Sequence, residues 1–221
     1  MNWTGVIAID GPAGAGKSTV AKLVASKLNI NYLDTGALYR AIAFYLDSIS
    51  VPPEESERLR KALFDVSVEL RGGAVFLNEK DVSSLIRTPH VDKIASLYSA
   101  LPSVREKLLS IQREQALIGG LVADGRDMGT VVFPFAPVKI FLTAKAEVRA
   151  RRRYDELVHN GIDITYEKLL SEIRQRDEAD AKRDIAPLVQ APDATLVDSS
   201  SMNADEVAEL IVDIARKFCH V

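Results

Sequence analysis

The feature that most constrains this chain is a glycine-rich turn between an apolar run and a helix-like segment near its start. Residues 6–19 read VIAIDGPAGAGKST, and Gly11, Gly16, Lys17 and Ser18 stand at the spacing GxxxxGK(S/T). Glycines let backbone N–H groups wrap an anion, and a helix that follows directs its positive dipole end at the same anion. The pattern therefore predicts a phosphate-binding loop between a strand and a helix, which belongs to an α/β fold.

Each residue of this loop has an expected task in holding a nucleoside triphosphate. We expect Lys17 to reach the β- and γ-phosphates, the Ser18 hydroxyl to bind Mg²⁺ and Thr19 to add a further donor. The glycine order does not fit G-x-G-x-x-G, which disfavours NAD binding. The residues expected to contact the triphosphate are Gly11, Pro12, Ala13, Gly14, Ala15, Gly16, Lys17, Ser18 and Thr19.

The composition fits one buried core and argues against several classes of protein. The chain has 221 residues, of which 47% are hydrophobic, and a net charge of −3, so it lacks the global basic field of a non-specific nucleic-acid binder. Cys219 is the only cysteine, which excludes an intrachain disulfide and fits a reducing compartment. The first residues lack Lys and Arg, and Asp10 interrupts the apolar run, so we expect no signal peptide, no membrane span and a cytoplasmic location.

Apolar runs with strand character alternate with segments of helical periodicity along the chain. They lie at residues 6–9, 121–123, 138–142 and 195–197. This alternation predicts a three-layer α/β fold in which helices flank a parallel sheet. Runs 66–70 and 74–78 are instead separated by Arg71-Gly72-Gly73, which predicts an antiparallel hairpin. We therefore expect one domain over 1–221 with a small β insertion at about 63–90.

Three further helices are predicted from proline punctuation and apolar spacing. Pro52-Pro53 followed by Glu54 begins a charged helix that runs to about residue 63, and Pro102 opens a second helix with the sequence VREKLLSIQREQALI. The final helix, ADEVAELIVDIARKF, has ordinary amphipathic spacing, which indicates packing and not a site.

Arginines gather in a helix that begins near Lys145. Arg149, Arg152 and Arg153 stand at i, i+3 and i+4 on one face. A solvated face explains such clusters most often, but this one follows a predicted parallel strand, where ligands of α/β sheets gather. We favour an anion-binding role.

A second charged helix covers about residues 166–183. Arg176, Asp180 and Arg183 lie on one side of it, and ion pairing with Asp180 would explain the spacing without a ligand. An arginine-rich lid over transferring phosphates would use the same preorganised groups. We predict such a lid at about 149–187.

Two polar segments are more specific. LDTGALYR places Asp34, Thr35 and Arg40 in one strand-to-helix transition, where Asp34 or Thr35 alone would also serve as a helix cap. The segment DGRDMG follows an apolar strand, so its charged groups emerge at the carboxyl end of that strand. There, Asp124 is a candidate to contact Mg²⁺ through water, with an ordinary turn residue as the alternative.

With the glycine loop, LDTGALYR and ADGRDMGTVVFP, the chain closely resembles bacterial cytidylate kinases over nearly its whole length. The resemblance implies an enzyme that uses ATP and Mg²⁺ to phosphorylate CMP and dCMP. We expect it to be a cytoplasmic monomer that binds neither nucleic acid nor membranes. Physically this is coherent, because charge repulsion between two polyanions is the main barrier and Lys17 with several arginines opposes it. A monophosphate dianion needs no strong general base, so aspartates are assigned to binding.

The resemblance also implies roles for particular residues. Thr35 stands where many relatives have serine, a change that keeps the hydroxyl. The residues implied for catalysis are Lys17, Arg126, Arg176 and Arg183, and Arg152 joins the loop in binding ATP. Those implied for the acceptor are Asp34, Thr35, Arg40, Ser96, Arg105, Arg126, Asp127, Asp180 and Arg183, and the metal would be held by Ser18 with Asp34 or Asp124 through water.

Three alternatives remain to be weighed. A kinase for another small acceptor, such as UMP or a shikimate-like metabolite, is disfavoured by DGRDMG and the β insertion. A nucleotide-binding regulatory module would usually read guanine through N-K-x-D, and residues 78–81 read NEKD, with the lysine misplaced. Binding of nucleic acid is disfavoured by net charge and by the absence of aromatic stacking motifs.

Overall fold

The computed structural model describes residues 3–159 and 161–218, and in it the chain divides into two compact units. The first unit is formed by Met1–Tyr32 and Gly119–Val221, and the second by Leu33–Ile118. Cys219, the single cysteine, lies outside the described residues. The two units are taken in turn.

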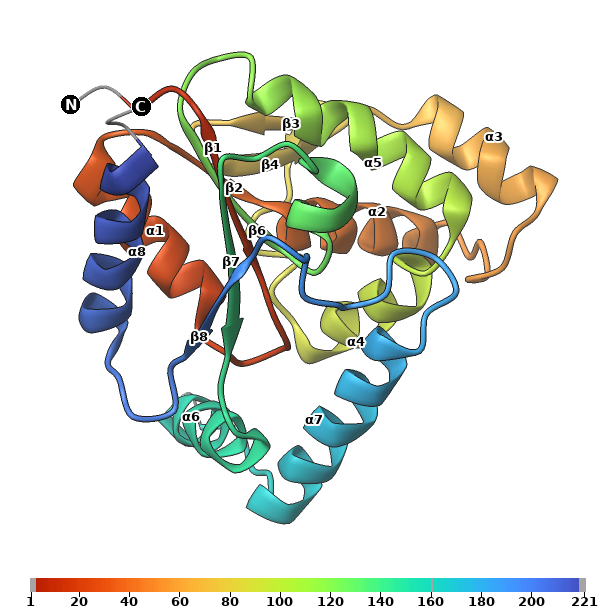
Figure 1. The fold of residues 1–221 in the computed structure, drawn as a ribbon. Coiled ribbons are helices and arrows are strands. Elements are labelled where there is room, and N and C mark those ends of the chain that lie inside the picture. Colours follow the sequence, from red (N-terminus) through yellow and green to blue (C-terminus); the bar gives the residue numbers. More distant parts are fainter. Residues whose placement is uncertain (1–2, 160, 219–221) are drawn as a thin grey trace. The chain divides into compact units, whose positions relative to one another are not determined.

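The first unit is built on a five-stranded parallel sheet, which confirms the predicted α/β class (Figure 1). The strand order is β2-β6-β1-β7-β8. Each of the four predicted sheet strands is present within a residue or two, and β2 is a fifth. The strands are β1 (Val6–Asp10), β2 (Asn31–Asp34), β6 (Leu121–Gly125), β7 (Val138–Thr143) and β8 (Thr195–Asp198).

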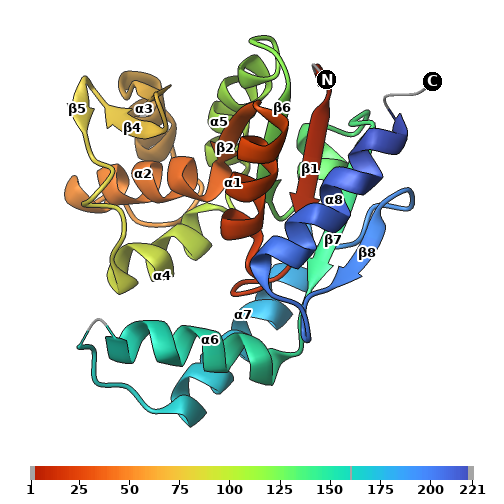
Figure 2. The same cartoon turned by 90° about the vertical axis from the view of Figure 1, so that its left-hand side faces the viewer.

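The central strands are continuous apolar runs because both faces of the sheet are covered. Residues 7–10 of β1 and 121–125 of β6 are all buried, as in sheets that have layers on both sides. Helices α1 (Lys17–Leu28) and α8 (Ala204–Phe218) pack together beside the strands, as Figure 2 shows. Their buried residues share one apolar core with β1 and β7, so the final helix has the packing role that its spacing predicts.

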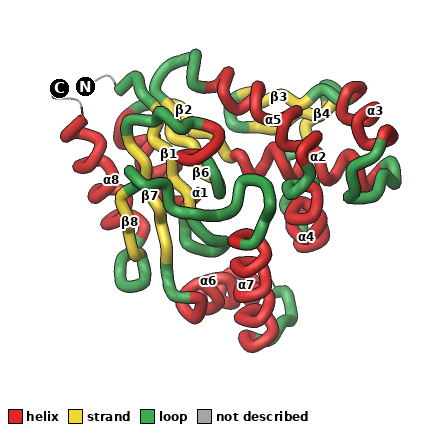
Figure 3. Tube along the Cα trace, turned by 45° about the vertical axis from the view of Figure 1, so that its right-hand side comes forward, coloured by secondary structure: helices red, strands yellow, loops and turns green. Residues whose placement is uncertain are grey.

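Three further elements complete the first unit. A single turn of π-helix, η1 (Met128–Val132), follows β6 and packs against β1 and β6. Helices α6 (Ala146–His159) and α7 (Tyr166–Ala181) pack against each other as a pair of neighbouring helices (Figure 3). These two helices are the arginine-bearing helices predicted from the sequence.

The second unit is mostly helical. Its core includes Leu38, Ile42 and Leu59, all fully buried, and α2 packs against both α4 and α5. The helices are α2 (Thr35–Ser48), α3 (Glu57–Asp65), α4 (Pro89–Tyr98) and α5 (Pro102–Gln115).

A small antiparallel sheet belongs to the same unit and confirms the predicted hairpin. Strand β3 (Val68–Arg71) pairs with β4 (Ala74–Leu77), and Arg71 lies opposite Ala74. The two residues between them, Gly72 and Gly73, have φ of 58° and 85°, as a two-residue turn that matches the strand twist requires. A short third strand, β5 (Lys80–Asp81), was not predicted.

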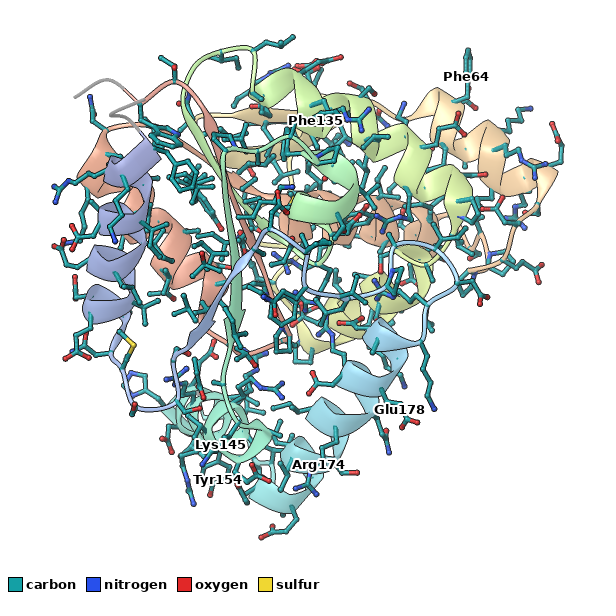
Figure 4. All side chains as sticks on the ribbon, viewed as in Figure 1. Phe64, Phe135, Lys145, Tyr154, Arg174 and Glu178 are labelled. Atoms are coloured by element: carbon teal, nitrogen blue, oxygen red, sulfur yellow. The ribbon has the colours of Figure 1, made fainter. Side chains whose placement is uncertain are left out.

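The predicted start of the charged helix is wrong by a few residues. It begins at Glu57 and not after Pro53, because the Ser56 hydroxyl accepts a hydrogen bond from Leu59 N at 3.2 Å and caps it there. The helix ends at Asp65, just after Phe64, whose side chain is 86% exposed and extends away from the ribbon in Figure 4. Across the described parts of the chain, no helix combines the length and apolar character needed to cross a bilayer.

Candidate active site

The glycine-rich loop connects β1 directly to α1, as predicted. Gly11 has a φ of 149°, and a Cβ added to it would lie 1.9 Å from the carbonyl oxygen of Leu142 in β7. No side chain can occupy that space, so only glycine lets the chain turn there beside the sheet. Gly14 and Gly16 also have positive φ, of 76° and 88°. The loop therefore presents glycine backbone at the amino end of α1, which is a geometry suited to binding phosphate.

Lys17 is the first residue of α1, and its ammonium group is buried. Its Nζ donates to the carbonyl of Pro12 at 2.8 Å, within the same loop. Burial holds the pKa of Lys17 well below its ordinary value, and the guanidinium groups of Arg126 and Arg176 lower it further, against the opposing effect of Asp124. Three cationic side chains thus converge at the loop, which is an arrangement suited to a polyanion.

Ser18, the next residue, contacts the acidic residue at the end of β6. Its hydroxyl donates to Asp124 Oδ2 at 2.9 Å, and the Tyr32 hydroxyl donates to Asp124 Oδ1 at 2.8 Å. Within the described residues, no group of three or more His, Cys, Asp or Glu side chains could hold a metal ion. One hydroxyl beside one carboxylate nevertheless fits Mg²⁺, because that ion keeps several waters and takes its remaining ligands from substrate phosphates.

Asp10 ends β1 and is a buried carboxylate that the sequence analysis did not assign to the site. Its two oxygens accept hydrogen bonds from the backbone N–H groups of Met128 and Gly129, at 2.8 and 2.7 Å. Burial raises the pKa of Asp10 to about 6, although the two N–H groups act in the opposite direction. The residue was detectable in principle, because it stands at the carboxyl end of a parallel strand, where ligand-binding groups gather.

Asp180 on α7 brings two of the predicted arginines together. Arg126 Nε donates to Asp180 Oδ2 at 2.8 Å, and Arg183 lies 2.6 Å from Asp180 Oδ1. Burial would raise the pKa of Asp180, but Arg126 and Arg183 outweigh burial and hold it below its ordinary value. The ion pairing that the spacing of this helix suggests is therefore present, and it extends to Arg126 in the loop after β6.

The three arginines that the sequence places on one face of α6 have different surroundings. Arg149 is buried, donates to the carbonyl of Ala13 in the glycine loop at 2.9 Å and forms a two-pronged ion pair with Asp177 of α7 at 3.0 and 2.6 Å. Arg152 Nη2 donates to the carbonyl of Ser199 at 2.7 Å, and its Nη1 lies 4.0 Å from the position of a Cβ on Gly16. Arg152 is thus close to the loop.

Arg153 differs from these two, because it pairs with Glu156 on the exposed surface of the same helix. For Arg153 the solvated face that we weighed against anion binding is therefore the better description. The ion pair between Arg149 and Asp177 is not predicted from the sequence, because Asp177 lies on a different helix, α7.

The second unit holds a separate charged cluster around Asp34. Asp34 Oδ1 accepts a hydrogen bond from Ala37 N at 2.8 Å and so caps α2. A helix cap is one of the two roles that the sequence suggests for Asp34. Arg40 and Arg87 both pair with the same carboxylate, at 3.3 and 2.8 Å. Arg40 Nε is buried, and none of the described residues accepts a hydrogen bond from it. This donor therefore remains for an anion.

The other residues expected in the second unit lie on three helices. Thr35 is the first residue of α2 and is buried. Ser96 lies on α4, and its carbonyl accepts from the Ser99 hydroxyl. Arg105 on α5 donates to the carbonyl of Ser99 at 3.2 Å, and its guanidinium lies 5.7 Å from the centre of the Tyr39 ring.

The structure thus groups the predicted residues in two sets. The set in the second unit is Asp34, Thr35, Arg40, Ser96 and Arg105. The set in the first unit comprises the glycine loop, Asp124, Arg126, Asp127, Arg152, Arg176, Asp180 and Arg183. Residues that sequence reasoning missed are Asp10, Tyr32, Arg87, Asp177 and Ser199, whose partners all come from other elements of the fold.

Comparison with known proteins adds a second line of information. A protein-family model described as cytidylate kinase matches residues 7–217. The cytidylate kinase of Fervidobacterium nodosum is 52% identical over 215 residues, covering 97% of this chain and 98% of that protein. The cytidylate kinase of Carboxydothermus hydrogenoformans is 48% identical over 216 residues, covering 96% of this chain and 97% of that protein.

Among solved structures, the chain is similar in fold to a gluconokinase from Sinorhizobium meliloti. The TM-score is 0.52 at 14% sequence identity, and the match covers 100% of this chain and 96% of that one. At this identity the likeness concerns the fold alone, and it agrees with the α/β class described above.

Proposed function

This chain belongs to the cytidylate kinase family, and from that premise we propose that it transfers the γ-phosphoryl group of ATP to CMP or dCMP, giving ADP and CDP or dCDP. The observation that carries the proposal is the glycine loop with buried Lys17 and its two guanidinium neighbours. A site of this kind opposes the repulsion between two polyanions, which is the main barrier to phosphoryl transfer.

The donor would be held by the first unit. The loop from Gly11 to Thr19 offers backbone N–H groups to the phosphates, and Lys17 and Arg152 add positive charge. Mg²⁺ would be held by the Ser18 hydroxyl, with Asp124 acting through water, and when bound it neutralises charge on the β- and γ-phosphate oxygens. The contact between Ser18 and Asp124 supports this assignment.

The acceptor would be bound by arginines and hydroxyl groups. In the second unit, Thr35, Arg40, Ser96 and Arg105 are proposed to bind CMP, and the buried Nε of Arg40 supports an anion there. Asp34 orients Arg40 through their ion pair. In the first unit, the proposed acceptor residues are Arg126, Asp127, Asp180 and Arg183.

Catalysis in this proposal is positioning and charge stabilisation. A monophosphate dianion already carries a nucleophilic oxygen near neutral pH, so no residue has to remove a proton from it. Lys17, Arg126, Arg176 and Arg183 would stabilise the charge that spreads over the transferring group. We propose that both units act as one kinase domain, with a β insertion at about 63–90 and a lid at about 149–187.

The experiment that tests the proposal is a coupled ADP-release assay across six acceptors. CMP and dCMP are expected to turn over well above UMP, AMP, GMP and shikimate, and chelation of Mg²⁺ is expected to abolish turnover. If CMP gives no more ADP than AMP or shikimate, the substrate assignment is wrong. The panel also separates this proposal from a kinase for another small acceptor and from a regulatory module, which would hydrolyse nucleotide slowly with every acceptor.

Two further parts of the proposal concern the oligomeric state of the enzyme and its location in the cell. We propose that the enzyme is a monomer in the cytoplasm. The single cysteine among 221 residues supports a reducing compartment. Light scattering after gel filtration at micromolar concentration would test the monomer, for which the expected mass is 24.2 kDa.

A further inference from the structure

Asp10 is a buried carboxylate that none of the roles proposed above uses. Its side chain ends β1, the residue is only 4% exposed, and both oxygens accept backbone N–H groups of η1. Burying a carboxylate is costly, and two N–H donors from adjacent residues offset only part of that cost. A residue kept at such a cost between the phosphate-binding loop and the DGRDMG segment calls for a functional reason.

The geometry at the start of η1 shows what the carboxylate does. Asp127 occupies the capping position of η1, where an aspartate would ordinarily accept the first N–H groups of its own helix, but it makes no side-chain cap bond. Asp10, from a strand far away in the sequence, accepts the N–H groups of Met128 and Gly129 instead. The Asp127 carboxylate is therefore not used as the cap.

The cap is also rigidly placed. Asp10 lies opposite Gly125 in the parallel register of β1 and β6, directly beside the point where Arg126 leaves the sheet. A Cβ on Gly129 would stand 3.1 Å from Lys139 Cδ and in ordinary van der Waals contact with Asp10 Oδ2, at 3.4 Å, so the carboxylate and its N–H partners are closely packed on this side. Asp10 thus fixes the backbone on both sides of Arg126 and Asp127.

We propose that Asp10 is a positioning residue for acceptor binding: by capping η1 it holds the backbone that carries Arg126 and Asp127 and keeps the Asp127 carboxylate out of the cap. The inference rests on the proposed function, in which those two residues bind CMP. The alternative is that Asp10 acts on the donor side through its charge, because it also attracts the ammonium group of Lys17. The two roles predict effects on different substrates.

The test is the kinetics of Asp10→Asn. Asparagine keeps the shape but offers one acceptor, so an NH₂ group meets one of the two N–H donors and the cap is broken. We expect the KM for CMP to rise by at least about tenfold while the KM for ATP stays within about twofold. An unchanged KM for CMP, or a larger change in the KM for ATP, would overturn the inference.

A double-mutant cycle with Asp127→Asn tests whether Asp10 acts through Asp127. If it does, the two substitutions together raise the KM for CMP by less than the product of their separate effects, because in the double variant Asp10→Asn can misplace only Arg126. Multiplicative effects of the two substitutions would contradict the proposal. The matched control is Ile9→Val, which shortens a fully buried side chain of the same strand and should leave both KM values unchanged.

Asp10→Glu keeps the proposal testable if Asp10→Asn does not fold. The added methylene group moves the carboxylate away from its N–H partners without changing any charge, so the KM for CMP should again rise selectively, and an unchanged value would refute the inference. The wild-type enzyme in the same assay distinguishes a failure of the proposed function from a failure of the role proposed for Asp10. If the wild type does not phosphorylate CMP, the proposed function fails; if it does and neither variant affects CMP, only the role of Asp10 fails.

Discussion

At the scale of single residues, Lys17 combines a buried ammonium group with two guanidinium neighbours. Such an arrangement costs stability in the empty protein and is useful only when negative charge arrives. The cost explains why the proposal gives Lys17 a catalytic role and not a structural one.

Lys17→Ala is therefore expected to lower kcat by at least about 100-fold while the fold persists, because charge stabilisation at the transferring group is lost. Steady-state kinetics and thermal unfolding measure the two effects. Lys27→Ala is the control, since Lys27 lies on the same helix in an exposed pair with Glu209 and should leave kcat unchanged. Turnover of Lys17→Ala at the wild-type rate would remove the loop from catalysis.

Asp10 makes a second prediction at this scale, concerning stability and pH. Its pKa is raised by burial from 3.8 to about 6 in the folded protein, so the folded state binds this proton more tightly than the unfolded state. Its contribution to stability is fully present below about pH 4 and is lost as pH rises through 6.

Relative to Asp10→Asn, which does not titrate, the wild type should lose about 2 kcal/mol of unfolding free energy between pH 4 and pH 7. Urea denaturation of both proteins across that range measures the difference. A difference between the two proteins that stays constant with pH would show that the Asp10 carboxyl keeps its ordinary pKa.

Sequence reasoning at the residue scale was strongest where neighbours in the chain supply the chemistry. The glycine loop and the cap at Asp34 are each complete within a few residues, so they could be read directly. Asp10 was read only as an interruption of an apolar run, because its N–H partners lie in a segment more than 100 residues later. Contacts of that length depend on the fold and leave no local pattern.

At the scale of elements, helix α7 is tied to the glycine loop through Arg149. This buried guanidinium donates to Ala13 and holds Asp177 of α7, next to Arg176. This ion pair holds α7 in place against the repulsion between Arg176 and Lys17. It thereby fixes the position of the face of α7 that carries Arg176.

Asp177→Asn should therefore lower kcat and raise the KM for ATP, each by roughly tenfold, because the misplaced helix no longer presents Arg176 to the phosphates. The chain offers a matched control in the pair of Glu147 and Arg174, which joins the same two helices at the exposed surface at 2.7 Å. Figure 4 labels Arg174 on α7. Glu147→Gln should change neither parameter, and an equal effect of both substitutions would contradict the role given to the buried pair.

The elements themselves were predicted well where their signals are local. Four strands of the parallel sheet contain short apolar runs, and Gly72-Gly73 indicates the hairpin. The start of α3 is predicted too early from Pro52 and Pro53, which resemble an opening signal, whereas the Ser56 cap decides it. Strand β5 spans two exposed residues, and its pairing with β4 could not be inferred from periodicity.

At the scale of the whole molecule, the proposed binding groups are divided between two compact units. The glycine loop belongs to one unit, and Arg40 with its buried, unused Nε belongs to the other. The proposal therefore predicts that substitutions separate the two substrates kinetically.

Arg40→Ala should raise the KM for CMP by at least about tenfold and leave the KM for ATP within about twofold, because it removes a charge-assisted contact to the smaller anion. Thermal stabilisation by ATP alone should persist in this variant. The reverse pattern, with ATP binding weakened and CMP binding intact, would place Arg40 on the donor side. The division into units was not visible in the sequence, which contains no linker between them.

The crowding of cations around Lys17 has a consequence for the protein when nucleotide is scarce. Folding brings Lys17, Arg126 and Arg176 together before any phosphate binds. A bound polyanion offsets the electrostatic repulsion among these side chains. We therefore expect the protein without bound nucleotide to be less stable against unfolding, and more susceptible to proteolysis, than the nucleotide-bound protein. The supply of ATP would then govern how long each molecule survives as well as how fast it works.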